Sequence, residues 1–139
     1  MQILKANMDD FLPVLEAGGQ VTLTVTGTSM LPLLRPGKDS VLLRSENIPK
    51  KGDILLYRRK NGRFVLHRVI GKTQNAFLCC GDNQWRREQV ERDQVVATVT
   101  GYCRSGKEKA LSSFGYKFYV NLLPLRRFYC RLRDFLFQK

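Results

Sequence analysis

Between residues 20 and 102 the chain is divided into short runs of aliphatic and β-branched residues, separated by residues that favour turns. Val21, Leu23 and Val25 alternate with threonines, which is the pattern of a strand with one buried face. Comparable runs occupy 40–44, 54–57, 64–70, 76–80 and 94–102. Asn61-Gly62 separates two of them and is a strong signal for a β-hairpin. The sequence therefore predicts a compact, mostly β domain that is barrel-like or sandwich-like.

A short helix is expected before the first strand. It would begin near Asn7, with acidic residues in its first turn, and end at Gly18. Phe11, Val14 and Leu15 would share its apolar face.

The C-terminal region, residues 106–139, has a different pattern. Six apolar residues recur there at steps of three and four, which places them on one helical face: Phe118, Leu122, Leu125, Tyr129, Leu132 and Leu136. Because Pro124 interrupts the pattern, we expect a basic amphipathic helix from about Leu125 onward and a looser segment before it. Eight Lys or Arg residues face only two Asp or Glu in this region.

Three roles for this region are open. The helix could pack its apolar face on the β-domain and leave its arginines in solvent. Residues 116–139 could instead bind an anionic membrane surface, because aromatic side chains interleaved with arginines suit the interface. The third alternative is a helix that binds a partner protein or nucleic acid. The net charge of +12 for the whole chain agrees with any polyanionic partner.

The length of 139 residues suits one domain with a core of its own. We expect residues 1–105 to form the β-domain with its N-terminal helix, and residues 106–139 to form a basic extension that belongs to the same unit or contacts a membrane or partner. No run approaches the roughly 18 apolar residues that cross a bilayer, and residues 1–7 lack a secretory pattern. These features predict a cytoplasmic protein, with peripheral attachment at the inner face of the membrane as an alternative.

The four cysteines predict neither disulfides nor a metal site. Cys79 and Cys80 are adjacent, Cys103 and Cys130 are isolated, and none has the spacing of metal ligands. We expect reduced cysteines that serve packing, with no metal and no cofactor.

Two residues can carry out covalent chemistry. Ser29 lies in the string Gly27 to Pro32, and His67 is the only histidine, inside a strand-like run. Strand alternation places His67 on one face with Val65 and Val69, where partial desolvation keeps an imidazole neutral and able to act as a general base. Each residue alone is more often structural. If they meet, His67 can take the proton of Ser29 and make it a nucleophile.

A third group should orient the imidazole. Asp82, in Gly81-Asp82-Asn83 at the end of a predicted strand, is the first candidate, and Glu88 is the alternative acid. Asp82 by itself also suits a turn.

Residues around the serine are candidates for oxyanion stabilisation and substrate binding: Gly27, Thr28, Met30 and Pro32. Gly27 lets the backbone approach a substrate carbonyl closely. The N–H of Ser29 can then donate a hydrogen bond to an oxyanion.

These strings, in this order, resemble the signal peptidase I superfamily of serine peptidases. The matching segments are 27–32, 35–41, 51–55, 67–70, 81–83 and 95–96, within roughly residues 20–102. The resemblance implies the coiled β fold of signal peptidases and SOS-type repressors, and serine endopeptidase activity on a peptide or protein substrate. It assigns Ser29 as nucleophile, His67 as base, and Asp82 or a nearby acid as the orienting residue.

Histidine at position 67 resembles the Ser/His branch found in the endoplasmic reticulum and archaea, whereas the other branch has lysine. The chain departs from the membrane-bound relatives because a polar segment precedes Ser29 in place of a transmembrane anchor. Gly27 stands where many relatives have a serine, and Glu88 where they have a second acid. The chain is thus most similar to small anchorless members, whose substrates the resemblance does not supply beyond a preference for small side chains before the cut.

Two other functions compete with peptidase activity. A degenerate peptidase on the same fold could bind an extended peptide by strand addition without cleaving it. A nucleic-acid-binding domain is not expected, because the sequence has no helix-turn-helix, zinc-finger or RNA-binding signature.

Overall fold

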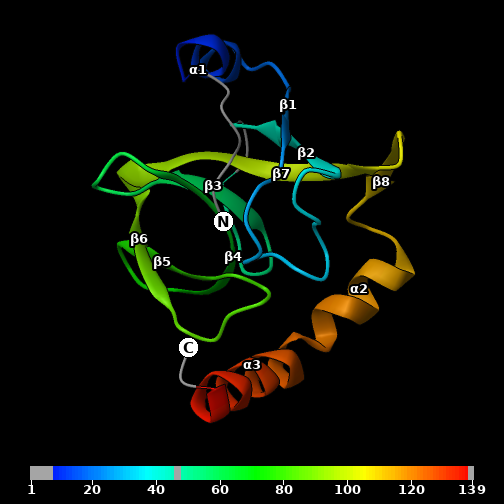
Figure 1. Ribbon diagram of the computed structural model, residues 1–139. Helices are drawn as coiled ribbons and strands as arrows, with labels where there is room; N and C mark the ends of the chain where they lie inside the picture. The colour runs from blue at the N-terminus through cyan, green and yellow to red at the C-terminus, as the bar shows by residue number, and fades with distance from the viewer. Residues whose placement is uncertain (1–7, 46–47, 138–139) are drawn as a thin grey trace.

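The computed structural model describes residues 8–45 and 48–137. Along the chain, its elements are α1 (Met8–Glu16), β1 (Val21–Thr24), β2 (Asp39–Arg44), β3 (Ile54–Arg58), β4 (Phe64–Lys72), β5 (Ala76–Cys80), β6 (Glu88–Glu91), a 3₁₀ helix (Arg92–Gln94), β7 (Val95–Arg104), β8 (Lys107–Ala110), α2 (Phe114–Asn121) and α3 (Leu123–Phe137). The mostly β class and the short N-terminal helix agree with the sequence prediction (Figure 1). Asn7, the predicted start of that helix, lies outside the described residues.

All eight strands belong to one antiparallel sheet. Its order is β1-β2-β7-β3-β4-β5-β6, and β8 pairs with β7. Register shifts in the β2–β7, β3–β7 and β4–β5 pairs are irregularities of the kind that bend strands. The end strands β1 and β6 are four residues each, and no pairing joins them within the described residues. The predicted barrel-like closure is therefore wrong, since the sheet curls but stays open (Figure 1).

The hydrophobic patterns locate six of the strands and miss β6 and β8. Both missed strands have four residues, most of them charged or polar, and β8 is exposed along its whole length. A short edge strand that buries at most one side chain shows no alternation of apolar and polar residues, so its sequence does not reveal it. Backbone pairing with β5 and β7 forms these strands instead.

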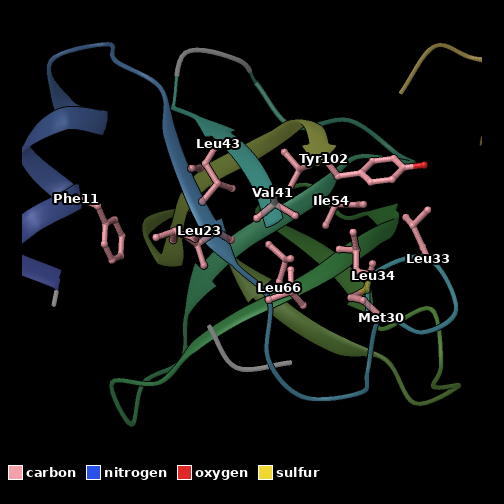
Figure 2. Close-up of a cluster of buried hydrophobic side chains, with 14 of the residues drawn as sticks. Phe11, Leu23, Met30, Leu33, Leu34, Val41, Leu43, Ile54, Leu66 and Tyr102 are labelled. Carbon is pink, nitrogen blue, oxygen red and sulfur yellow. The ribbon is translucent and has the colours of Figure 1, made fainter. Parts of the chain in front are cut away.

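The sheet buries hydrophobic side chains on both faces of the β3–β4 hairpin. Ile54, Leu56 and Leu66 join the larger cluster, which also takes in the helix residues Phe11 and Leu15 (Figure 2). The opposite face holds a smaller cluster of Leu55, Tyr57, Val65, Val69, Phe77, Cys79 and Val90. Each strand of the hairpin thus sends alternate side chains into two different cores. The predicted face of α1 is correct for its two buried residues but wrong for Val14, which is exposed.

The C-terminal region differs from its prediction in two ways. Residues 114–121 form helix α2 where a looser segment was predicted, and Pro124 lies in the first turn of α3, where a missing N–H is tolerated. The six residues that share a helical face are all exposed, so this face does not pack on the β-domain. Tyr116 and Tyr119 of α2 pack against the larger core cluster. Within residues 8–45 and 48–137, no helix is long and apolar enough to cross a bilayer.

Candidate active site

Ser29 lies in the loop between β1 and β2, which is anchored by its own apolar residues. Met30, Leu33 and Leu34 point into the larger core cluster (Figure 2). Gly27 has a φ of +73°, a conformation that favours glycine, and Leu31-Pro32 is a cis peptide bond. Gly27, Thr28 and Pro32 are exposed beside the buried Ser29, whereas the Met30 side chain is fully buried. Met30 was one of four residues predicted to bind the substrate. Because its side chain is buried, only its backbone can serve that role.

The loop after β5 contacts the loop that carries Ser29. Gly81 lies so close that a Cβ atom there would be 2.6 Å from the Ser29 carbonyl oxygen, so only glycine fits. The backbone N–H of Asn83 donates to that carbonyl at 2.8 Å, and its side-chain amide donates to the Thr28 carbonyl at 3.1 Å. The backbone of Asp82 contacts the Met30 sulfur at 3.4 Å. The segment 81–83 thus sets the position of Ser29.

Ser29 and His67 meet, although 38 residues separate them in the sequence. The Oγ of Ser29 lies 3.2 Å from Nε2 of His67, and both residues are buried. His67 projects from β4 beside Leu55 of β3, with which it is paired in the sheet. Burial, together with the positive charges of Arg59 and Arg127, lowers the pKa of His67 to about 3. The imidazole is therefore neutral at physiological pH, as a general base must be.

The other nitrogen of His67 faces Tyr57. Nδ1 lies 3.1 Å from the Tyr57 hydroxyl, which donates its proton to Glu88 at 3.0 Å. Two hydrogen bonds from Arg59, at 3.0 and 2.8 Å, hold the Glu88 carboxylate. Burial and the adjacent Glu88 raise the pKa of Tyr57, so the phenol keeps its proton.

This chain of contacts determines the tautomer of the imidazole. A tyrosine hydroxyl has one proton, and here that proton goes to Glu88, so the Tyr57 oxygen accepts a hydrogen bond from His67. Nδ1 then carries the imidazole proton and Nε2 presents its lone pair to Ser29. That is the arrangement in which Nε2 can accept the hydroxyl proton.

Asp82 does not contact His67. Its carboxylate accepts two hydrogen bonds of 2.9 Å from Arg68 and one of 2.8 Å from the Tyr119 hydroxyl. Arg68 follows His67 in β4, so its side chain points to the other face of the strand, and the ion pair is almost completely buried. The structure therefore does not bring the first predicted acid to the imidazole, while the alternative, Glu88, reaches it only through Tyr57.

Tyr57, Arg59 and Arg68 were not among the site residues that the sequence predicted. The hairpin register pairs Leu55 with His67 and Tyr57 with Val65, so Tyr57 lies on the same face as His67. Counting outward from the turn at Asn61-Gly62 would have pointed to this tyrosine. Arg68 carried a weaker signal, namely a charged residue inside a strand that is apolar on both faces.

Two backbone N–H groups at the serine are candidate donors to an oxyanion. Within the described residues, the N–H groups of Ser29 and Met30 donate no hydrogen bond to protein atoms, although Met30 is fully buried. The described residues contain no cluster of three or more His, Cys, Asp or Glu side chains that could hold a metal. Cys79, Cys80 and Cys130 are buried free thiols, and Cys103 is a half-buried one.

Asp82→Asn should strongly destabilise the protein. The substitution leaves the Arg68 guanidinium buried without its counter-ion, which typically costs about 3–5 kcal/mol. Lys60→Gln, which removes an exposed pair with Glu91 at 3.5 Å, is the matched control and should cost less than about 1 kcal/mol. Urea denaturation of both variants measures the difference. A change below about 1 kcal/mol for Asp82→Asn would contradict the role assigned to this pair.

The geometry agrees with the comparison of the chain with known families. The profile of the family described as Peptidase S24-like matches residues 5–101, which is more than half of the chain and includes Ser29, His67 and Asp82. Comparison with curated proteins and with solved structures gave no match. Membership of this family implies a serine peptidase with a fold of the signal-peptidase and SOS-repressor kind. The chain belongs to the Peptidase S24-like family.

Proposed function

We propose that this protein is a serine endopeptidase of the Ser/His type, with Ser29 as nucleophile and His67 as general base. The observation that carries the proposal is the 3.2 Å separation between Ser29 Oγ and His67 Nε2, in the tautomer that accepts a proton. Histidine takes the place that lysine has in the other branch of the signal peptidase superfamily. The substrate is a peptide or protein, and its sequence preference is open.

The reaction follows from the positions of these atoms. Ser29 Oγ attacks the carbonyl carbon of the scissile peptide bond while His67 Nε2 takes the hydroxyl proton. The N–H groups of Ser29 and Met30 donate hydrogen bonds to the resulting oxyanion. The imidazolium then gives its proton to the leaving amine, and an ester on Ser29 remains. Water, deprotonated by the same nitrogen, hydrolyses the ester and restores the serine hydroxyl.

Tyr57 and Glu88 serve as positioning residues in this proposal, in place of Asp82. The Tyr57 oxygen holds the Nδ1 proton, and Glu88 with Arg59 keeps the phenol oriented. When the imidazolium forms, its positive charge is stabilised by the dipole of the Tyr57 hydroxyl. The Glu88 carboxylate contributes only through Tyr57, because it does not contact the imidazole directly. This support is weaker than direct contact with a carboxylate, so we expect a slow enzyme.

A non-catalytic peptide-binding module is the second candidate, and burial of the site favours it. Ser29 is 7% exposed and His67 is 3% exposed, so little of either residue is open to an incoming peptide. The strongly lowered pKa of His67 also opposes formation of the imidazolium. Both features suit a site that binds without turnover.

Cleavage of a peptide library distinguishes the two candidates. The full-length protein should generate new termini that mass spectrometry detects. Ser29→Ala and His67→Gln should each lower the rate by about 10³-fold or more, because the nucleophile or its base is lost. Ser112→Ala, which removes an exposed serine outside the site, is the matched control and should leave the rate unchanged. Peptide binding without cleavage by the wild type would support the binding module.

Tyr57→Phe should lower kcat while leaving KM unchanged. The ring stays in the core, but Nδ1 loses the acceptor that selects its tautomer, so we expect a fall of roughly tenfold to hundredfold. Tyr102→Phe alters a core tyrosine away from the site and serves as the control. Kinetics on a substrate found in the library screen measure both variants. Equal kcat values for Tyr57→Phe and the wild type would exclude Tyr57 as the positioning residue.

A further inference from the structure

Helix α3 is docked with its polar face inward. Its arginines Arg126, Arg127 and Arg133 contact the 80–84 segment, and Cys130 on the same face is buried. Arg127 donates to the Gly81 carbonyl at 2.7 Å, while Arg126 and Arg133 donate to the Asn83 side-chain oxygen at 2.7 and 3.0 Å. These hydrogen bonds fix the rotation of the helix about its axis. The apolar side of α3 is consequently turned away from the protein.

An apolar surface covers the outer side of α2 and α3, which lie along one side of the sheet, away from α1 (Figure 1). Its members have between 43% and 86% of their surface exposed: Phe114, Phe118, Leu122, Leu125, Phe128, Tyr129, Leu132, Phe135, Leu136 and Phe137. We call these ten residues the outer face. Ten exposed apolar side chains on two neighbouring helices mark a surface that binds a partner or a membrane.

A basic hollow borders the outer face. It has a volume of about 640 Å³ and is lined by Trp85, Arg86, Arg87, Arg131 and Phe128, together with Arg127. The guanidinium groups of Arg86 and Arg131 each lie 5.2 Å from the centre of the Trp85 ring. Arg86, Arg87 and Arg131 are exposed, so their charge is available to an anion at this edge.

We propose that the outer face binds the surface of a bilayer that contains anionic phospholipids. Aliphatic and aromatic side chains enter the boundary between headgroups and acyl chains, and the arginines of the hollow bind lipid phosphates. The boundary between lipid headgroups and acyl chains suits such a surface. The Phe, Leu and Tyr side chains of the outer face are apolar, and the arginines at its edge can bind phosphates.

The net charge of the chain and the length of α3 disfavour the other arrangements of this surface. A second copy would bring a further net charge of +12 and its own arginines against this edge, which opposes self-association. Nucleic acid would use the arginines but would leave ten apolar side chains in water. The 15 residues of α3 span about 22 Å, less than the roughly 30 Å of a bilayer core, so the helix lies in the interface and does not cross it.

Binding in this orientation places the candidate active site near the membrane. The inner side of α3 contacts Asn83, whose backbone N–H donates to the Ser29 carbonyl. One helix, about 10 Å thick, therefore separates the bilayer surface from the segment that holds Ser29. Arg127 of the hollow also donates to Gly81 behind Ser29, but the ten residues of the outer face and the exposed Arg86, Arg87 and Arg131 make no contact with Ser29 or His67 among the described hydrogen bonds.

Vesicle sedimentation with purified full-length protein tests the proposal. The probes are vesicles of phosphatidylcholine alone and of phosphatidylcholine with about one third phosphatidylglycerol, since anionic lipid strengthens binding by about fivefold per basic residue. We expect binding to the anionic vesicles and much weaker binding to the neutral ones. One variant removes apolar surface and keeps helix propensity: Leu125→Gln, Leu132→Gln and Phe135→Gln combined. It should lower the affinity at least about tenfold with an unchanged circular dichroism spectrum.

Charge variants and Ser29→Ala complete the experiment. Substitution of the three exposed arginines of the hollow by Gln should also weaken binding at least about tenfold. The matched control loses the same charge elsewhere, through Lys38→Gln, Lys60→Gln and Lys72→Gln, and should stay within about threefold of the wild type. Ser29→Ala should bind like the wild type, so failure of the peptidase proposal would not affect this result.

Three results would overturn the proposal. The first is absence of binding to anionic vesicles. The second is binding that depends on the arginines but is unchanged in the apolar variant, which would indicate a general polyanion site such as one for nucleic acid. The third is a dimer in sedimentation equilibrium that the apolar variant converts to monomer, which would assign the outer face to self-association.

Discussion

The buried ion pair between Arg68 and Asp82 is the interaction on which the rest of the structure depends. It links β4 to the loop after β5, and through Tyr116 and Tyr119 it links both to α2. Arg68 also donates to the Gly52 carbonyl, which ties in the turn before β3. Because neither charge has access to water, the pair tolerates little displacement. The ion pair therefore fixes the position of β4. It also fixes the imidazole of His67, which directly precedes Arg68 in the strand.

The side chains on the two sides of β4 have different roles. Arg68 on one side binds Asp82 in the loop whose Gly81 and Asn83 contact the backbone of Ser29 and Thr28. His67 on the other side faces Ser29 with one nitrogen and Tyr57 with the other. Strand alternation thus places consecutive residues of β4 on opposite sides, where Arg68 holds the loop next to Ser29 and His67 contacts Ser29 itself. Helix α3 also holds this loop in place, because its arginines donate hydrogen bonds to the 80–84 segment.

The sequence could predict those features that depend on local pattern. Hydrophobic alternation located six strands. The resemblance of the ordered motifs to signal peptidases, and not either residue alone, indicated the Ser29–His67 pair that the structure brings together. The partner of Asp82 could not be predicted this way, because it depends on how the loop after β5 lies against Arg68 in space. For α3, periodicity correctly grouped the apolar residues, but hydrogen bonds to a distant loop determine that this group faces outward. The short strands β6 and β8 depend on backbone pairing and carry no pattern of their own.

The neutral imidazole of His67 carries its proton on Nδ1 and offers the lone pair of Nε2 to Ser29. Nitrogen-15 NMR of the imidazole across a pH series tests it directly, and the signals need no assignment because the chain has one histidine. The lowered pKa, about 3, means that the ring should remain neutral as the pH falls well below 6.5, with the proton on Nδ1 throughout. A proton on Nε2 at neutral pH, or a titration near the ordinary value of 6.5, would contradict the geometry described for this site.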